Sequence, residues 1–322
     1  MTAVATPRCS VDPHGRRIEY LRLSVTDLCN LRCTYCVPAQ GVRKIAHAEI
    51  LTLEELAEVA RSAIALGVTK VRITGGEPLI RRGLLSLIGA LAGSPGLETL
   101  ALTTNGTRLG EMARPLAEAG IQRVNVSLDS LDPGTFAQIT RGGEVASVVA
   151  GIDAALAAGL PVKINAVLLA GINTGEIEAL AAFARGRGLG LRFIELMPFD
   201  RALPLFSEAD AVAALRTSGD EVTPLAPEPG EPHVRRFAHR GAVVGFIAPV
   251  TRPFCGDCNK IRVTPEGAIK PCLASDYSVD VRAVLRRPHT PADVERVIAE
   301  AIRAKPATAP WSAPSEMWRV GG

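Results

Sequence analysis

The sequence has few aromatic residues, little net charge and no long apolar run. Aromatics make up 4% of the 322 residues, and 36 Lys and Arg against 33 Asp and Glu give a formal net charge of +3. Nucleic-acid surfaces usually combine a strong basic excess with stacking aromatics, so we expect no nucleic-acid partner, although a local basic pocket for a small anion fits this composition. No apolar run approaches the roughly 18 residues of a membrane span, so we expect no membrane partner.

The first 15 residues lack the apolar stretch of a secretory signal and are interpreted as a flexible leader, which makes the cytoplasm the expected location. Seven cysteines in such a chain indicate metal or redox chemistry rather than a disulfide framework. Cys9 lies in the leader and is expected to be a free surface thiol.

Short β-branched or apolar runs alternate with longer helical patterns. Strands are expected at Tyr20–Val25, Lys70–Thr74, Thr99–Thr103, Arg123–Leu128, Val162–Leu169 and Leu191–Met197. Helices are expected from Thr52 to Gly67 and at Arg108–Ala119, Val145–Ala158, Glu176–Arg187 and Glu208–Leu215. This α/β alternation predicts a parallel sheet covered by helices. Without a GxGxxG fingerprint, it favours an incomplete (β/α)6 TIM-like barrel over a doubly wound open sheet.

The pattern changes in the last third of the chain. Thr223–His233 is rich in Pro and charge and is expected to be a linker or surface loop. Strands at Ala242–Pro249 and Lys260–Thr264, a return at Ala268–Pro271 and a helix at Pro291–Ala304 are expected beyond it. We therefore expect a leader at 1–15, a barrel at 16–222, and a linker with a β-rich C-terminal extension at 223–322.

Six cysteines form two triplets. Cys29, Cys33 and Cys36 follow the first expected strand, where three thiolates on one loop can hold a four-iron cluster and leave one iron open. The second triplet is Cys255, Cys258 and Cys272, and a hairpin between the last two could bring them together. A zinc site needs four ligands and would leave two of these six thiols over, whereas two clusters would use all of them. Both alternatives remain open on spacing alone.

The first triplet, with Tyr35 before its last cysteine and GGEP at Gly75–Pro78, resembles the radical S-adenosylmethionine (SAM) superfamily. The second triplet, the terminal Gly321-Gly322 and the segments LRLSVTDLCNLRC, VRITGGEPL, LTTNG and IELMP resemble its GTP 3′,8-cyclase family, over about residues 15–322. The resemblance implies a radical SAM type partial barrel with a second cluster in the C-terminal extension. It also implies a lyase that converts GTP to (8S)-3′,8-cyclo-7,8-dihydroguanosine 5′-triphosphate, the first step of molybdenum cofactor biosynthesis. The implied cofactors are two [4Fe-4S] clusters and SAM.

The same resemblance assigns roles to residues. It makes the first triplet the catalytic cluster ligands and the second triplet the ligands of the guanine-binding cluster. It places Tyr35, Gly76, Glu77, Ser127 and Met197 around SAM, with the Glu77 carboxylate available to the SAM ammonium. For GTP it implies Arg22, Arg72, Thr103, Lys163, Lys260, Ile261 and Arg262. It also implies that the Gly-Gly tail reaches into the active site.

Some positions depart from the family pattern. Leu28 and Val37 replace the usual Arg and Met beside the first triplet, and Lys260 replaces an Arg, which keeps the charge but loses the planar fork. The usual His after Lys305-Pro306 is absent. Implied partners are GTP, an electron donor that the sequence does not identify and a downstream cyclic pyranopterin monophosphate synthase, and a homodimer is compatible with the sequence. The alternatives are a peptide-modifying radical SAM enzyme with an auxiliary cluster, and a non-catalytic zinc protein.

Overall fold

The computed structural model of the chain describes residues 10–38, 40–41, 44–198, 204–216, 220–228, 231 and 233–311. Cys9 and the Gly321-Gly322 tail lie outside these residues. Six strands lie side by side in chain order and run parallel. They are β1 (Tyr20–Ser24), β2 (Lys70–Thr74), β3 (Thr99–Thr104), β4 (Arg123–Ser127), β5 (Val162–Leu168) and β6 (Gly190–Glu195). All six expected strands are confirmed within one or two residues at their ends.

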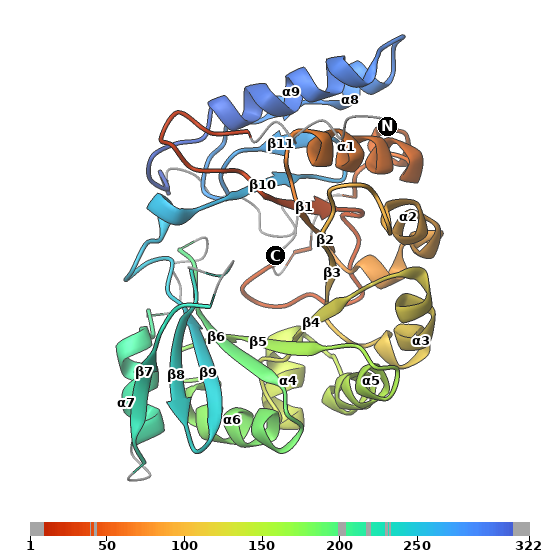
Figure 1. Ribbon diagram of the computed structural model, residues 1–322. Coiled ribbons are helices and arrows are strands. Elements are labelled where there is room, and N and C mark those ends of the chain that lie inside the picture. The colour runs from red at the N-terminus through yellow and green to blue at the C-terminus, as the bar shows by residue number, and fades with distance from the viewer. Residues whose placement is uncertain are drawn as a thin grey trace, which may run out of the picture.

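Helices cover the outer face of the curved sheet (Figure 1). They are α1 (Leu53–Ala65), α2 (Leu84–Leu91), α3 (Leu109–Ala119), α4 (Pro133–Thr140), α5 (Val145–Ala157), α6 (Ile177–Gly186) and α7 (Glu208–Arg216), with α8 (Arg282–Leu285) and α9 (Pro291–Arg303) near the C-terminus. Short 3-10 turns occur at His47–Glu49, Pro78–Ile80, Thr174–Glu176 and Cys255–Asp257. Thr52 and Glu55 form the capping box that starts α1. No helix in the described ranges has the length and apolarity needed to cross a membrane.

The C-terminal strands extend this sheet at both edges. They are β7 (Val222–Leu225), β8 (Arg235–His239), β9 (Ala242–Ile247), β10 (Lys260–Val263), β11 (Ala268–Lys270) and β12 (Val279–Asp280). Strand β10 pairs parallel with β1, and β9 pairs parallel with β6. The described residues therefore form one open twelve-stranded sheet, in the order β12-β11-β10-β1-β2-β3-β4-β5-β6-β9-β8-β7. The fold is α/β with an open sheet, consistent with a partial TIM barrel.

The segment expected to be a linker begins differently, because Val222–Leu225 is strand β7, paired antiparallel with β8. Its Pro224 occupies an edge strand, where a missing N–H is tolerated. The Pro and charge content of this segment therefore did not distinguish a loop from an edge strand.

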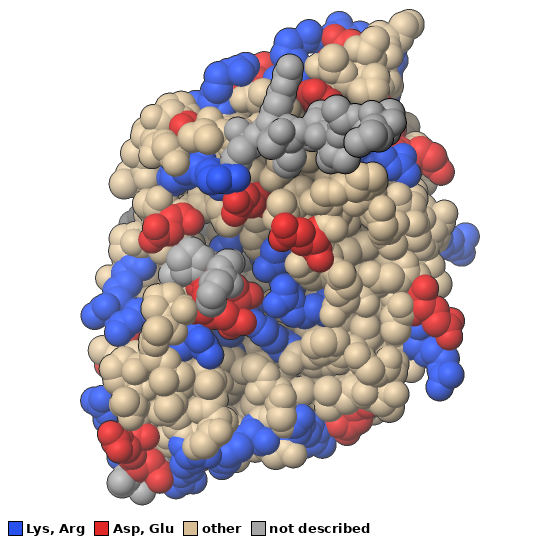
Figure 2. Space-filling view, in the orientation of Figure 1, with Lys and Arg blue, Asp and Glu red and all other residues tan. Residues whose placement is uncertain are grey.

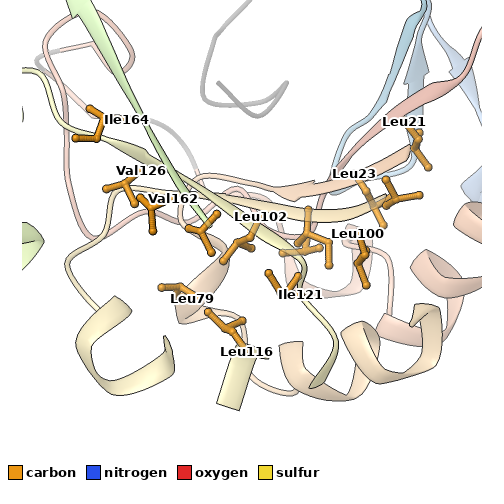
Figure 3. Packing of buried hydrophobic residues seen from close by; sticks show 14 of the residues in the cluster. Leu21, Leu23, Leu79, Leu100, Leu102, Leu116, Ile121, Val126, Val162 and Ile164 are labelled. Atoms are coloured by element: carbon orange, nitrogen blue, oxygen red, sulfur yellow. The ribbon is translucent and has the colours of Figure 1, made fainter. Parts of the chain in front are cut away.

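The apolar core lies between the sheet and the helices. Leu21, Leu23, Leu100 and Leu102 point from their strands towards the helical layer (Figure 3). Strand β5 alternates buried and partly exposed residues along its whole length. Alternate side chains of a strand point to opposite faces, so the second row points to the concave side of the sheet. Polar residues of that row build the site.

Candidate active site

A cavity of about 530 Å³ lies on the concave side of the sheet, and all six cysteines of the two triplets line it. The first triplet follows the carboxyl end of β1, and the second flanks β10 and β11. Figure 2 shows Lys and Arg side chains gathered in a hollow near the middle of the molecule, with Asp and Glu side chains beside them. Segments more than 200 residues apart in the chain therefore line the same cavity.

The loop of the first triplet is docked on the carboxyl end of α4. The Thr34 N–H donates to the Ile139 carbonyl over 2.9 Å, and the Arg32 N–H donates to the Thr140 carbonyl over 3.2 Å. From the next residue, the Arg141 guanidinium donates to the Arg32 and Val37 carbonyls over 2.9 and 2.7 Å. The end of α4 therefore sets the position of Cys29, Cys33 and Cys36.

Tyr35 fixes the same loop to the sheet. Its hydroxyl donates to Asp129 Oδ2 over 2.7 Å, and Asp129 Oδ1 accepts the Val167 N–H over 2.8 Å. Burial raises the pKa of Asp129 to about 6, and burial with the nearby Asp129 raises the pKa of Tyr35 well above its ordinary value. The Tyr35 hydroxyl therefore remains protonated and acts as a hydrogen-bond donor.

The GGEP turn packs against the segment that precedes Cys29. A Cβ on Gly76 would lie 2.2 Å from the Leu28 carbonyl oxygen, so only glycine fits there. Glu77 is the residue expected beside the SAM ammonium. Its carboxylate is fully buried and accepts the Thr104 hydroxyl at 2.7 Å and the Asn105 and Leu79 N–H groups at 2.7 and 2.9 Å. Glu77 is not among the residues that line the cavity, because β3 and its own turn already satisfy its carboxylate.

Ser127 and Met197 line the cavity from the ends of β4 and β6. Asn125 and Asn165 line it beside them, and their side-chain oxygens are buried with no hydrogen-bond partner among the described residues. Unpaired buried acceptors are costly unless a ligand or water donates to them. This wall is therefore suited to a ligand with hydroxyl or amino groups.

Arg22, Arg72, Lys260 and Arg262 form a basic wall of the cavity, and Thr103 lines it on β3. These cations surround Tyr20, whose hydroxyl accepts from Arg72 Nε. Burial lowers the pKa of Lys260 to about 7 and that of Arg22 to about 9, with neighbouring arginines contributing in the same direction. Such crowding of positive charge is relieved by an anion. The side chain of Ile261 does not share this wall, because it lies in the core on the opposite face of β10.

Lys163 lies at the start of β5, below this wall. Its Nζ donates to Glu231 Oε2 over 3.2 Å and lies 3.6 Å from Glu228. Lys163 is not among the cavity-lining residues, although Glu231 and its other partner Arg192 are. Lys163 therefore lies behind the carboxylate of Glu231. We call the part of the cavity at Glu231 and Arg192 its floor.

The second triplet is covered by the segment that follows α9. The Lys305 ammonium donates to Cys258 Sγ at 3.5 Å and to the Lys260 and Pro271 carbonyls, each at 2.8 Å, and the Ala309 N–H donates to Cys255 Sγ at 3.3 Å. Burial raises the pKa of the Cys258 thiol, but Lys305 and Lys260 outweigh it and the pKa falls below its ordinary value. Arg16 holds this segment by donating to the Pro306 carbonyl over 2.7 Å.

The donor set fits iron–sulfur clusters. All six cysteines of the triplets are free thiols, and all six line the same cavity. Three cysteine ligands leave one iron of a cubane open to another molecule. In the described part of the chain, no three His, Cys, Asp or Glu side chains converge as they would around a single metal ion.

Comparison with known proteins gives the family. Residues 23–184 match the radical SAM superfamily, and residues 189–311 match the family described as Molybdenum Cofactor Synthesis C. GTP 3′,8-cyclase 1 of Pseudomonas aeruginosa is 45% identical over 95% of this chain and 95% of its own. The GTP 3′,8-cyclase of Pelotomaculum thermopropionicum is 43% identical over 97% and 99% of the two chains. The chain belongs to the GTP 3′,8-cyclase family.

As a member of this family, the chain is a radical SAM enzyme that uses SAM and an iron–sulfur cluster. Among solved structures, the crystal structure of Streptococcus suis SuiB matches with a TM-score of 0.63 at 16% identity, covering 91% of this chain and 68% of that one. SuiB bound to S-adenosylmethionine matches with a TM-score of 0.62 at 16% identity, covering 88% and 69%. At this identity the likeness concerns the fold alone.

Several site residues of this cyclase-family chain were not anticipated from its sequence. They are Lys70, Asn125, Asp129, Asn165, Arg192, Glu231, His233 and Lys305. A signal was present for part of the set, because Asn125 and Ser127, like Lys163 and Asn165, are polar residues two apart in otherwise apolar strands. No comparable signal marks Glu231, His233 or Lys305, since each lies in an irregular segment.

Proposed function

We propose that the chain cyclises GTP by joining C3′ of the ribose to C8 of the guanine, which is the first step of molybdenum cofactor biosynthesis. One observation carries this proposal: two open cysteine triplets and a basic wall line one cavity, in a chain of the GTP 3′,8-cyclase family. A near-neutral protein that concentrates cations in its cavity is suited to a polyanionic substrate.

The first triplet would hold the cluster that binds SAM. When bound, this cluster and SAM supply the carbon-centred radical on which such enzymes depend. Tyr35 holds the cluster loop against Asp129, and Gly76 allows the GGEP backbone to pack beside it. Ser127 and Met197 would contact SAM, and the buried Glu77 would act by fixing the turn rather than by direct contact.

The basic wall would bind the triphosphate. Arg22, Arg72, Lys260 and Arg262 supply charged donors, each hydrogen bond contributing about 1.5 to 3 kcal/mol, and Thr103 adds a hydroxyl. Lys163 would act from the floor, and Ile261 would contribute only its backbone. Lys260 gives a point charge where an arginine would give a fork, so phosphate geometry at this position differs.

The second triplet would hold a second cluster whose open iron faces the guanine. Cys255 and Cys258 each accept a hydrogen bond from the segment after α9, and such bonds tune the potential of a cluster. The product would pass to a cyclic pyranopterin monophosphate synthase. The proposal also includes an electron donor for the clusters and a homodimer.

The test is an oxygen-free assay of the reconstituted protein with GTP, SAM and a chemical reductant. We expect GTP to be consumed, the cyclised triphosphate to appear and 5′-deoxyadenosine to form with it. Intact GTP under conditions that cleave SAM would reject the substrate. Adding peptide in place of GTP tests the peptide-modifying alternative, and zinc without iron or sulfide would favour the non-catalytic one.

A further inference from the structure

The floor of the cavity contains a buried carboxylate, Glu231, which is 5% exposed. Its Oε2 accepts from Arg192 Nη2 and from Lys163 Nζ, the latter over 3.2 Å. Its Oε1 lies 3.9 Å from both Lys70 Nζ and Arg123 Nη1. One carboxylate thus faces four cations from four different strands.

Glu231 is ionised in this setting. Burial by itself raises the pKa of the carboxyl, but Arg192, Lys163 and Lys70 outweigh burial and lower the pKa to about 2. The carboxylate therefore carries a full negative charge throughout the working pH range.

Two of the four cations also lie in the cavity that contains the basic wall. Lys70 and Arg192 line the cavity together with Glu231, and Lys70 lies 4.8 Å from the ring centre of Tyr20, which the wall cations also surround. Arg192 is paired in register with Asn165, a cavity-lining residue whose side-chain oxygen has no hydrogen-bond partner in the part of the chain that the structure describes. A polyphosphate that reached this floor would meet Glu231 among its cations.

Four cations around Glu231 leave positive charge over, even when the half-exposed Glu228 beside Lys163 is included. Removing a carboxylate from such a group raises the local potential and makes a bound anion more favourable. A bound anion would neutralise this excess positive charge.

We infer that Glu231 competes with the triphosphate for the cations at the floor of the cavity. It keeps these cations in place and weakens the binding of a polyphosphate to them. This inference rests on the proposed function for the identity of the substrate, a nucleoside triphosphate. Glu231 is a positioning residue here, and its effect is on substrate affinity rather than on the chemical step.

The experiment measures binding of inorganic tripolyphosphate to the reconstituted protein by calorimetry without oxygen. Glu231→Gln should bind the anion about tenfold more tightly than the wild type, because a buried negative charge has been removed from the site. The matched control is Glu228→Gln on the same segment, whose side chain is 44% exposed and also lies near Lys163. Solvent screens this charge, so the affinity should change by less than about twofold.

Glu231→Asp is the second variant, and its affinity for tripolyphosphate tests the inference if Glu231→Gln does not fold. Its carboxylate keeps the charge but lies farther from Arg192, so affinity should fall between those of the wild type and Glu231→Gln. With GTP as substrate, KM should decrease in both variants while kcat does not rise. Wild-type or weaker anion affinity in the folded Glu231 variants would overturn the inference. Binding of tripolyphosphate requires no catalysis, so tighter binding without GTP cyclisation would reject the proposed function and leave the inference standing.

Discussion

Gly76 shows how closely the backbone of the active site is packed. The positions that a Cβ would approach are the Leu28 carbonyl oxygen and carbon at 2.2 and 2.5 Å and the Asp27 carbonyl oxygen at 2.8 Å. All three are backbone atoms, which cannot move aside as the end of a flexible side chain can. A substitution must therefore shift the segment that leads into Cys29.

For Gly76→Ala we expect SAM cleavage to fall by about 100-fold, because displacement of reacting groups by about 1 Å can cost that much. The measurement is 5′-deoxyadenosine formed per enzyme under reducing conditions. Gly89→Ala on the exposed side of α2 is the control, since its Cβ meets nothing within 4 Å and activity should persist. Normal cleavage by Gly76→Ala would contradict the packing argument.

His233 gives a pH-dependent contribution to stability. Its ring lies 5.4 Å from that of Phe254, and burial with the nearby Lys260 and Arg192 lowers its pKa to about 2. The unfolded chain, with a histidine pKa near 6.5, binds more protons between these values. The contribution is therefore complete above about pH 6.5 and is lost as the pH falls towards 2.

Between pH 7 and 5, His233→Gln should lose about 2 kcal/mol less unfolding free energy than the wild type, as measured by urea denaturation. His289 is a control of opposite sign. A hydrogen bond with the Arg287 carbonyl and another with Glu58 raise its pKa, so His289→Gln should lose slightly more stability than the wild type on acidification. Equal losses in the wild type and His233→Gln would show that His233 titrates normally in the folded protein.

At the scale of elements, α4 has a role larger than its eight residues suggest. It lies after β4, and its last carbonyls accept hydrogen bonds from the loop of the first cysteine triplet. This helix was not predicted from the sequence, because Gly134 and two threonines have low helix propensity and obscure a short apolar period. The usable signal was Asp132 before Pro133, since Asp caps helices and Pro occupies their first turn.

Arg141→Met should release iron from the first triplet several-fold faster than the wild type does, while leaving the fold intact. The change removes the hydrogen bonds to the Arg32 and Val37 carbonyls, which hold the loop on α4. The decay of visible cluster absorbance in the presence of a chelator measures the release. Arg114→Met, on the exposed side of α3, should behave like the wild type. Equal rates of absorbance decay in both variants would show that the contact with α4 does not hold the first triplet in place.

At the scale of the molecule, the cavity is assembled by the pairing of β10 with β1. That pairing places Lys260 beside Tyr20 and Arg262 beside Arg22, and it brings the second triplet to the chamber of the first. The alternating apolar runs predicted the six central strands, because each run is long enough to cross the core. They could not predict which edge β9 and β10 would join, since strand partners depend on contacts between distant segments.

The same distinction holds for the site. Cys29, Cys258 and Arg72 could be identified because motif spacing or strand position marks them. Glu231 could not, because a glutamate in a Pro-rich segment resembles a solvated surface charge until the fold places it among four cations. Glu77 was identified, but two of its three hydrogen bonds come from Thr104 at the end of β3 and from Asn105 after it, which the GGEP motif does not reveal.

Substitutions in the two triplets should affect SAM cleavage and GTP cyclisation differently. Cys33→Ala should abolish SAM cleavage, because it removes one of the three proposed ligands of the cluster that binds SAM. Cys258→Ala should mainly lose cyclisation of GTP while retaining slow SAM cleavage, because the first triplet and its loop are untouched. Parallel assays of 5′-deoxyadenosine and cyclised product measure both activities, and equal loss of the two in Cys258→Ala would argue against a substrate-binding role for the second triplet.

We propose that two open iron–sulfur sites line one cavity, and the metal content of the protein distinguishes two clusters from one. Iron and acid-labile sulfide are to be quantified per chain in protein that has been reconstituted and kept without oxygen. We expect about eight of each, as two four-iron clusters require. About four irons would leave the second triplet without a cluster, and zinc without iron or sulfide would contradict the account altogether.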